Sequence, residues 1–240
     1  MTRFWLPAEE KFLGPLTLAC VWLAAVLVRA HAPSLDQPLP TLPEYLRLGV
    51  EHVLIGYDHL AFVLGLALLA RTRRATFLSV TSFTLAHSLS LAACVLDVLT
   101  PNARWIEVGI ALSIAYVAVA QRFKLPSGGG VGVALVFGFV HGFGFAGALE
   151  EVGVPSAAVV PALALFNLGV ELGQLAVLVV LVPVLERLRT RPQLWPRLAL
   201  GLHAALFLLG IGLAAERSQW LWSAPEQDPT TASITASRSS

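Results

Sequence analysis

Long apolar stretches constrain this chain more than any other feature of its sequence. Seven runs of mostly apolar residues each approach or exceed about 20 residues, the length that an α-helix needs to cross a bilayer. They cover residues 12–30, 48–70, 75–97, 104–121, 130–149, 157–185 and 196–215. Only 13% of the residues are charged, whereas soluble domains average about 25%. The sequence therefore predicts an all-α integral membrane protein.

Basic residues between these stretches predict how the chain crosses the membrane. Arginine and lysine are concentrated in alternate connections, which the positive-inside rule places in the cytoplasm. These residues are Arg71, Arg73, Arg74, Arg122, Lys124, Arg187, Arg189, Arg191 and Arg197. The other connections, and with them the C-terminus, are expected outside.

The ends of the chain frame a core of six predicted transmembrane helices, residues 48–215. Residues 1–32 are interpreted either as a cleaved signal peptide, because an A-x-A pattern ends at Ala32, or as an N-terminal anchor that makes a seventh span. Residues 33–47 are rich in proline and are expected to form an outer linker. Residues 216–240 are expected to be a disordered outer tail.

Six polar side chains lie near the middle of the apolar stretches. They are Asp58, His59, His87, His141, Asn167 and Glu171. An ionisable group at the bilayer centre costs at least about 3 kcal/mol, and it usually faces the interior of a helix bundle. Because these residues come from four different stretches, we predict that they meet in one polar centre halfway across the membrane.

Helical spacing adds further polar residues to these faces. His52 and His59 are seven residues apart, which on a continuous helix separates them by about 10 Å along the axis. That distance is too great for one shared ion, so we interpret them as successive positions on a path. Thr84 and Ser88 lie one helical turn apart, and Gln174 continues the polar face of the sixth stretch. We expect these three to support the polar centre.

The donor atoms of the predicted centre are nitrogen and oxygen, without sulfur. Imidazole suits nickel, zinc, copper and iron, and a carboxylate offsets the charge of a cation. Cys20 and Cys94 lie inside separate apolar stretches and are interpreted as packing residues. We therefore predict a site for a divalent transition metal. Its expected ligands are His52, Asp58, His59, His87, His141, Asn167 and Glu171.

Four motifs in this order resemble one protein family. They are His52-x5-Asp58-His59, Phe83-Thr-Leu-Ala-His87-Ser88-Leu, His141-Gly-Phe-Gly-Phe-Ala and Phe166-Asn167-Leu-Gly-Val-Glu171-Leu-Gly-Gln174. Over residues 45–215 the chain resembles the HupE/UreJ family of bacterial inner-membrane proteins, which are associated with hydrogenase and urease gene clusters. The resemblance implies a permease for nickel or cobalt.

The family's second motif is only partly present. In the nickel permeases this motif resembles Phe-His-Gly-x-Ala/Val-x-Gly-x-Glu. This chain has Val140 in place of the phenylalanine and Ala148 in place of the glutamate. Only His141-Gly142 matches, so the sequence is closer to a less characterised branch of the family. We infer that Glu171 supplies the missing carboxylate.

Together these observations predict inward transport of a divalent metal ion across a bacterial inner membrane. Glu51 and Glu107 would form an outer vestibule that attracts the cation. The sequence has no Walker A pattern, which leaves passive flux or ion coupling as the driving force. The expected partners are the bilayer and the metal ion, with no cofactor and no nucleic acid; self-association is left open.

Two other functions remain open at this point. In an intramembrane hydrolase, His87, His141 and Asp58 would hold zinc and activate a water molecule. In an assembly or sensor subunit, the polar centre would be structural.

An internal repeat is predicted at an offset of 83 residues. It aligns Asp58 with His141, Phe62 with Phe145, Leu66 with Leu149, Phe83 with Phe166, Leu85 with Leu168, Ser88 with Glu171 and Leu89 with Leu172. The paired stretches would cross the membrane in opposite directions. Inverted repeats of this kind place substrate sites near the bilayer midplane.

Overall fold

Helices make up most of the part of the chain that the structure describes. The computed structural model describes residues 40–70, 72–120, 123, 130–152 and 158–221, and these contain no strand. The helices are α2 (Leu42–Ile55), α3 (Tyr57–Leu69), α4 (Arg73–Val95), α5 (Ala103–Ala120), α6 (Val131–Val152), α7 (Val159–Arg189), α8 (Trp195–Arg217) and the short 3-10 helix η3 (Gln219–Leu221). The predicted first stretch and the tail beyond residue 221 lie outside the described residues.

The described helices support a multi-pass membrane protein. Helices α4, α5, α7 and α8 are long and apolar enough to cross a membrane, and the pair α2 and α3 makes a fifth span if its two parts are counted together. The apolar part of α6, Val131–Ala146, is shorter than the other spans. The prediction of an all-α membrane protein is confirmed. Length and composition support four or five of the six predicted core spans.

The predicted helix over residues 48–70 is wrong in one respect that matters for the site. The structure has two helices there, α2 and α3, bent by 69° at a break. The break falls at Gly56, whose backbone N–H still reaches the His52 carbonyl oxygen at 3.0 Å. A side chain at Gly56 would press against that same oxygen. An uninterrupted apolar pattern hides such a break, because a single glycine is its only signal.

Helix α2 begins at Leu42, earlier than the predicted span and inside the range expected to be linker. Pro43 fits there because the first turn of a helix needs no backbone donor from it. The Glu44 carboxylate accepts hydrogen bonds from the backbone N–H of Thr41 at 2.5 Å and from its hydroxyl at 2.8 Å. This arrangement caps the helix and fixes its first turn.

Glycines bring two pairs of helices into close contact. Helix α2 packs along α7, and α4 packs along α6. A Cβ atom at Gly49 would overlap the carbonyl oxygen of Phe166, and one at Gly138 would overlap that of Phe83. Small residues at such crossings allow backbones to approach closely within a membrane.

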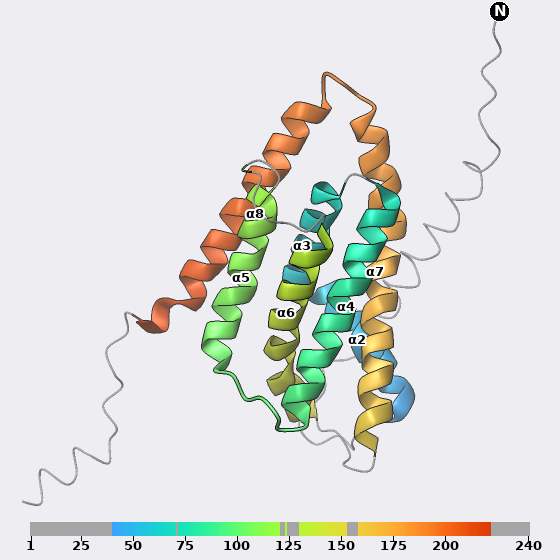
Figure 1. Ribbon diagram of the computed structural model, residues 1–240, viewed down its shortest axis with the longest axis vertical. Helices are drawn as coiled ribbons and strands as arrows, with labels where there is room; N and C mark the ends of the chain where they lie inside the picture. Colours follow the sequence, from blue (N-terminus) through green and yellow to red (C-terminus); the bar gives the residue numbers. More distant parts are fainter. Residues whose placement is uncertain (1–39, 71, 121–122, 124–129, 153–157, 222–240) are drawn as a thin grey trace, which may run out of the picture.

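The two close pairs run in opposite directions. Gly49 lies against Phe166 and Gly173 lies against Val53, so α2 and α7 are parallel. The corresponding contacts show that α4 and α6 are also parallel to each other, and Figure 1 shows that this pair points the opposite way. Helices α5 and α8 likewise pack side by side in opposite directions. These are the directions that the predicted inverted repeat requires.

Arginines gather at one end of the bundle, where α4 begins, α7 ends and α8 begins (Figure 1). Arg73 forms an ion pair with Glu186, which ties α4 to α7. Arg189 donates hydrogen bonds to the carbonyl oxygens of Ala67 and Ala70 at 2.8 and 3.2 Å. The predicted cytoplasmic connections therefore share one end of the molecule in the part that is described.

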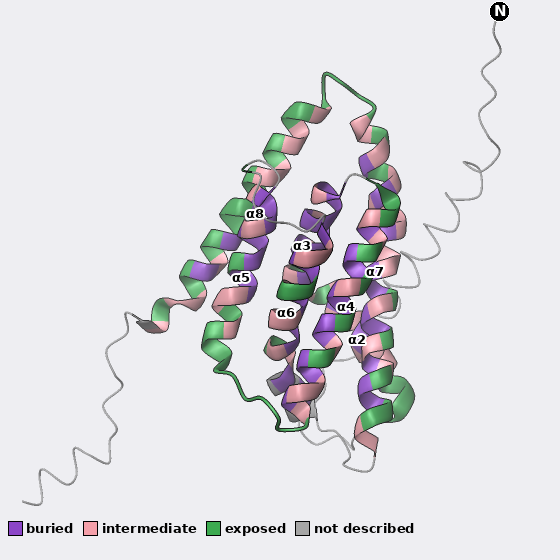
Figure 2. Cartoon of the chain, viewed as in Figure 1, coloured by how far each residue is buried: buried purple, intermediate pink, exposed green. Residues whose placement is uncertain are grey.

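Buried residues lie on the facing sides of the inner helices (Figure 2). Phe62, Phe83 and Phe166 are among the largest side chains with almost no exposed surface. Helix α8 is different, since only 17% of its apolar 18-residue segment is buried inside the protein. It therefore covers the outer edge of the bundle, where most of its surface is available to lipid.

Candidate metal centre

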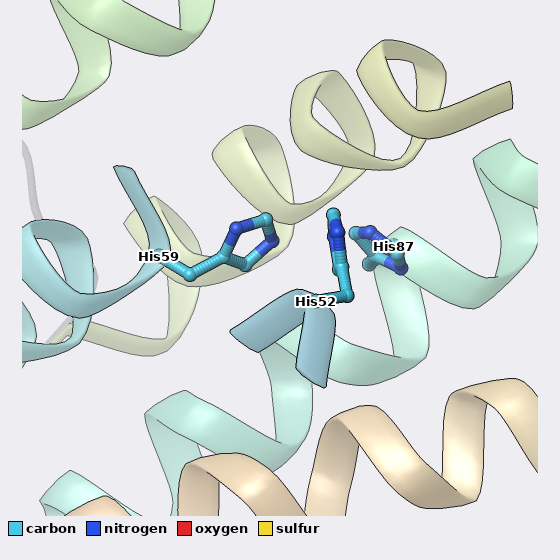
Figure 3. A group of neighbouring side chains, drawn as sticks. All are labelled: His52, His59 and His87. Atoms are coloured by element: carbon cyan, nitrogen blue, oxygen red, sulfur yellow. The ribbon is translucent and has the colours of Figure 1, made fainter. Parts of the chain in front are cut away.

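Three histidines from three helices form a compact group inside the bundle (Figure 3). His52 comes from α2, His59 from α3 and His87 from α4, and one ring nitrogen from each lies within 4.8 Å of the others. The ring centroids of His52 and His59 are 4.4 Å apart, and each is 5.9 Å from that of His87. His59 and His87 are buried and His52 is half-buried. Three imidazoles at this separation suit a divalent transition metal.

The predicted separation of His52 and His59 is therefore wrong. It assumed a continuous helix, whereas α3 is bent by 69° relative to α2 at the break at Gly56. The two rings meet edge to face instead of lying two turns apart. The break is thus what allows both residues to belong to one group of ligands.

His141 on α6 lies beside this group. Its ring centroid is 5.3 Å from that of His59. The Nδ1 atom lies 2.7 Å from the backbone carbonyl oxygen of Phe137, so this nitrogen carries the proton and donates. The buried Nε2 atom makes no hydrogen bond within the described residues. Orientation of a ring by a carbonyl acceptor is typical of metal-binding histidines, although His141 is not one of the three histidines of the compact group.

Asp58 is paired with an arginine. Its Oδ2 atom accepts a hydrogen bond of 2.8 Å from Arg217, at the end of α8, and the two form an ion pair. The other carboxylate oxygen is buried and makes no hydrogen bond within the described residues. The structure therefore does not bring the Asp58 carboxylate into the histidine group, even though the next residue, His59, belongs to it.

Asn167 and Glu171 on α7 are not among the three histidine ligands, although the Asn167 side chain interacts with that of His87 and so lies beside the group. The Asn167 side-chain N–H donates to the Leu163 carbonyl oxygen at 2.8 Å. One carboxylate oxygen of Glu171 accepts a hydrogen bond of 2.7 Å from the Thr81 hydroxyl. The remaining side-chain oxygen of each residue is buried and has no such partner among the described residues.

The predicted supporting residues connect α4 to α7. The Thr84 hydroxyl donates to the side-chain oxygen of Gln174 at 2.7 Å, and both residues are buried. Ser88 instead donates to the backbone carbonyl oxygen of Thr84, one turn earlier in the same helix. The Thr84–Gln174 hydrogen bond therefore joins α4 to α7, whereas the Ser88 hydrogen bond stays within α4.

The two residues predicted for the vestibule have different surroundings. Glu51 forms an ion pair of 2.7 Å with Arg47, one turn earlier in α2. Glu107 is exposed, and its backbone carbonyl oxygen accepts a hydrogen bond of 3.2 Å from Arg217.

Sequence reasoning missed Arg217. The signal was present, because this arginine ends the last apolar stretch on the side that the positive-inside rule leaves poor in basic residues. An arginine in that position has a structural or functional reason to be there.

Two aromatic trios, each of one histidine and two phenylalanines, combine residues from both halves of the chain. The ring of His141 lies 5.1 Å from that of Phe62 and 5.0 Å from that of Phe83, and the two phenylalanines are 5.3 Å apart. We call this trio the His141 cage.

The second trio, the His52 cage, repeats this arrangement. His52 lies 3.9 Å from Phe145 and 5.6 Å from Phe166, and these phenylalanines are 4.7 Å apart. Phe62 and Phe83 align with Phe145 and Phe166 at the predicted offset of 83 residues. The histidine is the exception, because His141 corresponds in space to His52 and not to Asp58 as the ungapped alignment has it.

The described residues thus define a multi-pass helical membrane protein with a buried group of imidazoles between its spans. A sequence profile described as HupE / UreJ protein matches residues 29–222. The chain belongs to the HupE/UreJ family, as the motifs predict. This family is associated with nickel and cobalt uptake, and its members are transporter-like. Searches of curated proteins and of solved structures found no match.

Proposed function

We propose that this protein is a membrane permease for a divalent transition-metal ion, with nickel or cobalt as the transported metal. The observation that carries the proposal is the group of His52, His59 and His87, whose ligand atoms lie within 4.8 Å of one another between membrane helices. Family membership supports the choice of nickel or cobalt.

The composition of the group favours transport over permanent binding. Among the described residues, its ligand atoms come from imidazoles alone, and neutral imidazoles do not compensate the charge of a dication. A conducting site has to bind its ion well enough to admit it and weakly enough to release it. Three neutral ligands without a fixed carboxylate meet that requirement better than a closed structural site does.

The proposed path is built from the residues that the sequence analysis predicts. Glu51 and Glu107 attract the cation, and Asp58 with the three histidines receives it. His141 binds the ion through its open Nε2 atom, and Asn167 and Glu171 supply oxygen ligands from α7. In the proposed orientation the arginine-rich end faces the cytoplasm of a bacterium, the path runs inward and the C-terminus is outside.

The proposal is tested by uptake into proteoliposomes that contain the purified full-length protein. Nickel, cobalt, zinc and copper are offered in turn, and accumulation is measured with Asp58→Asn and His141→Ala beside the wild type. We expect each variant to reduce nickel or cobalt accumulation by at least about tenfold, the usual effect of losing a metal-site residue.

His203→Ala is the matched control. This histidine lies on α8, and its Nδ1 atom is bonded to the carbonyl oxygen of Ala199 one turn earlier, so its loss should leave accumulation unchanged. Normal accumulation in both Asp58→Asn and His141→Ala would remove the transport role from this centre. Zinc retained in equal molar amount after purification would instead favour the hydrolase.

A further inference from the structure

An ion pair between distant parts of the chain holds the carboxylate next to the histidine group. Arg217 and Asp58 are 159 residues apart in the sequence, and their side chains are only 15% and 20% exposed. The same guanidinium group donates to the Glu107 carbonyl oxygen at 3.2 Å and lies 3.4 Å from the Tyr57 hydroxyl. Arg217 therefore connects the end of α8 to the first turn of α3 and to α5.

The histidine group lacks the negative charge that a dication needs in a medium of low dielectric constant. Its described ligand atoms all belong to imidazoles. A cation in such surroundings is stable only when an anion accompanies it. Asp58 directly precedes His59 in the first turn of α3, and one of its oxygens is buried without a hydrogen bond to any described residue. The carboxylate best placed in sequence to compensate the metal is thus held by an arginine.

We propose that Arg217 is the resident counter-charge of Asp58 and that the transported dication displaces it. Binding of the metal then exchanges one positive charge for another at a single carboxylate. This inference rests on the proposed function. It names Arg217 as the residue that sets the affinity of the centre for the cation and its preference for divalent over monovalent ions.

Such an exchange favours divalent over monovalent cations. A monovalent ion offers Asp58 no more charge than the guanidinium group already does, and it cannot replace the directional hydrogen bonds of an arginine. A dication offers twice the charge and gains imidazole ligands in addition. Arg217 is the last residue of α8, so it can leave Asp58 without moving the rest of that helix.

The test compares Arg217→Gln with the wild type in proteoliposomes, over a range of nickel concentrations and with or without potassium ions. We expect the KM for nickel to fall by about tenfold, because the metal no longer has to break a charge-assisted hydrogen bond. Potassium should leave nickel uptake by the wild type unchanged and should inhibit uptake by Arg217→Gln. Arg217→Lys should lie between the two, since it keeps the charge but not the hydrogen-bond geometry.

Arg73→Gln is the matched control, because Arg73 also forms an ion pair between two helices, with Glu186 at the opposite end of the bundle. Its KM should equal that of the wild type. If Arg217→Gln is not recovered from membranes, the double variant Asp58→Asn/Arg217→Gln, which leaves no unpaired charge, should be recovered. Because it lacks the Asp58 carboxylate, its KM for nickel should be higher than that of the wild type.

An unchanged KM in Arg217→Gln, or a fall in maximal rate alone, would show that the ion pair only holds α3 and α8 together. A wild type that transports neither nickel nor cobalt would contradict the proposed function, and the inference would then be decided by equilibrium dialysis of zinc against the purified protein in detergent. Tighter zinc binding by Arg217→Gln would support the exchange. Equal binding, or none by either protein, would overturn it.

Discussion

The His52 cage and the His141 cage share one design, and their difference is instructive. Each places a histidine against two phenylalanines, and the phenylalanines correspond at an offset of 83 residues. The histidines correspond at an offset of 89 residues. The first half therefore carries six additional residues between its histidine and its first phenylalanine.

These additional residues account for the asymmetry of the metal centre. They fall in the part of the chain where α2 breaks at Gly56 and α3 begins, and where Asp58 and His59 lie. In the second half, α6 passes from His141 to Phe145 without a break. A repeated aromatic frame has thus gained, in one copy only, the bend that brings a second imidazole and a carboxylate to the middle of the bundle.

The largest expected effect comes from removing the bend. Gly56→Ala places a Cβ atom against the His52 carbonyl oxygen, so α2 and α3 have to change their relative angle and His59 moves away from His52. We expect nickel accumulation to fall by at least about tenfold, as on loss of a ligand. Uptake in proteoliposomes measures this effect.

Gly201→Ala on α8 is the control for that change, because a Cβ atom there meets nothing within 4 Å. Its uptake should be normal, and its helix should be slightly more stable, since alanine favours helix over glycine by about 1 kcal/mol. Normal uptake by Gly56→Ala would mean that the bend does not build the centre.

A smaller effect distinguishes the two close helix crossings. Gly49→Ala and Gly138→Ala each place a methyl group on a backbone carbonyl oxygen, of Phe166 and Phe83 respectively. Overpacking of this kind costs about 1–3 kcal/mol of stability, and equivalent crossings should lose equal amounts. Thermal unfolding in detergent measures both losses, and a large difference between them would argue against a true repeat.

The smallest effect is expected where the two halves align but have different chemistry. Ser88 aligns with Glu171, yet its hydroxyl donates to the Thr84 carbonyl oxygen in its own helix. Ser88→Ala should change stability by no more than about 0.5 kcal/mol, as substitutions away from critical contacts usually do. Unfolding and uptake are measured together; a strong loss of either would give Ser88 a role equivalent to that of Glu171.

The sequence predicted the helical class and most of the residues near the centre, because hydrocarbon selects strongly against buried polar groups. His59, His87 and His141 were found in this way, and all three lie inside the bundle. The motif spacing also predicted the family, which the profile match confirms.

Other features were beyond the reach of local patterns. Periodicity treats residues 48–70 as one helix, since Gly56 interrupts neither the apolar run nor its length. Spacing along one helix therefore gave the wrong distance between His52 and His59. The partner of Asp58 is Arg217, at the far end of the core, and no rule based on neighbouring residues connects the two.

The parallel packing of α2 on α7 and of α4 on α6 has a consequence for biosynthesis. The first helix of each half, α2 or α6, packs against a helix of the other half. Neither half therefore has a complete interior of its own. During synthesis, the histidines of the first half therefore lack their final packing partners until α6 and α7 have been inserted into the membrane. Truncated chains should for this reason be degraded, and the two halves expressed from separate genes should assemble only when they are made together.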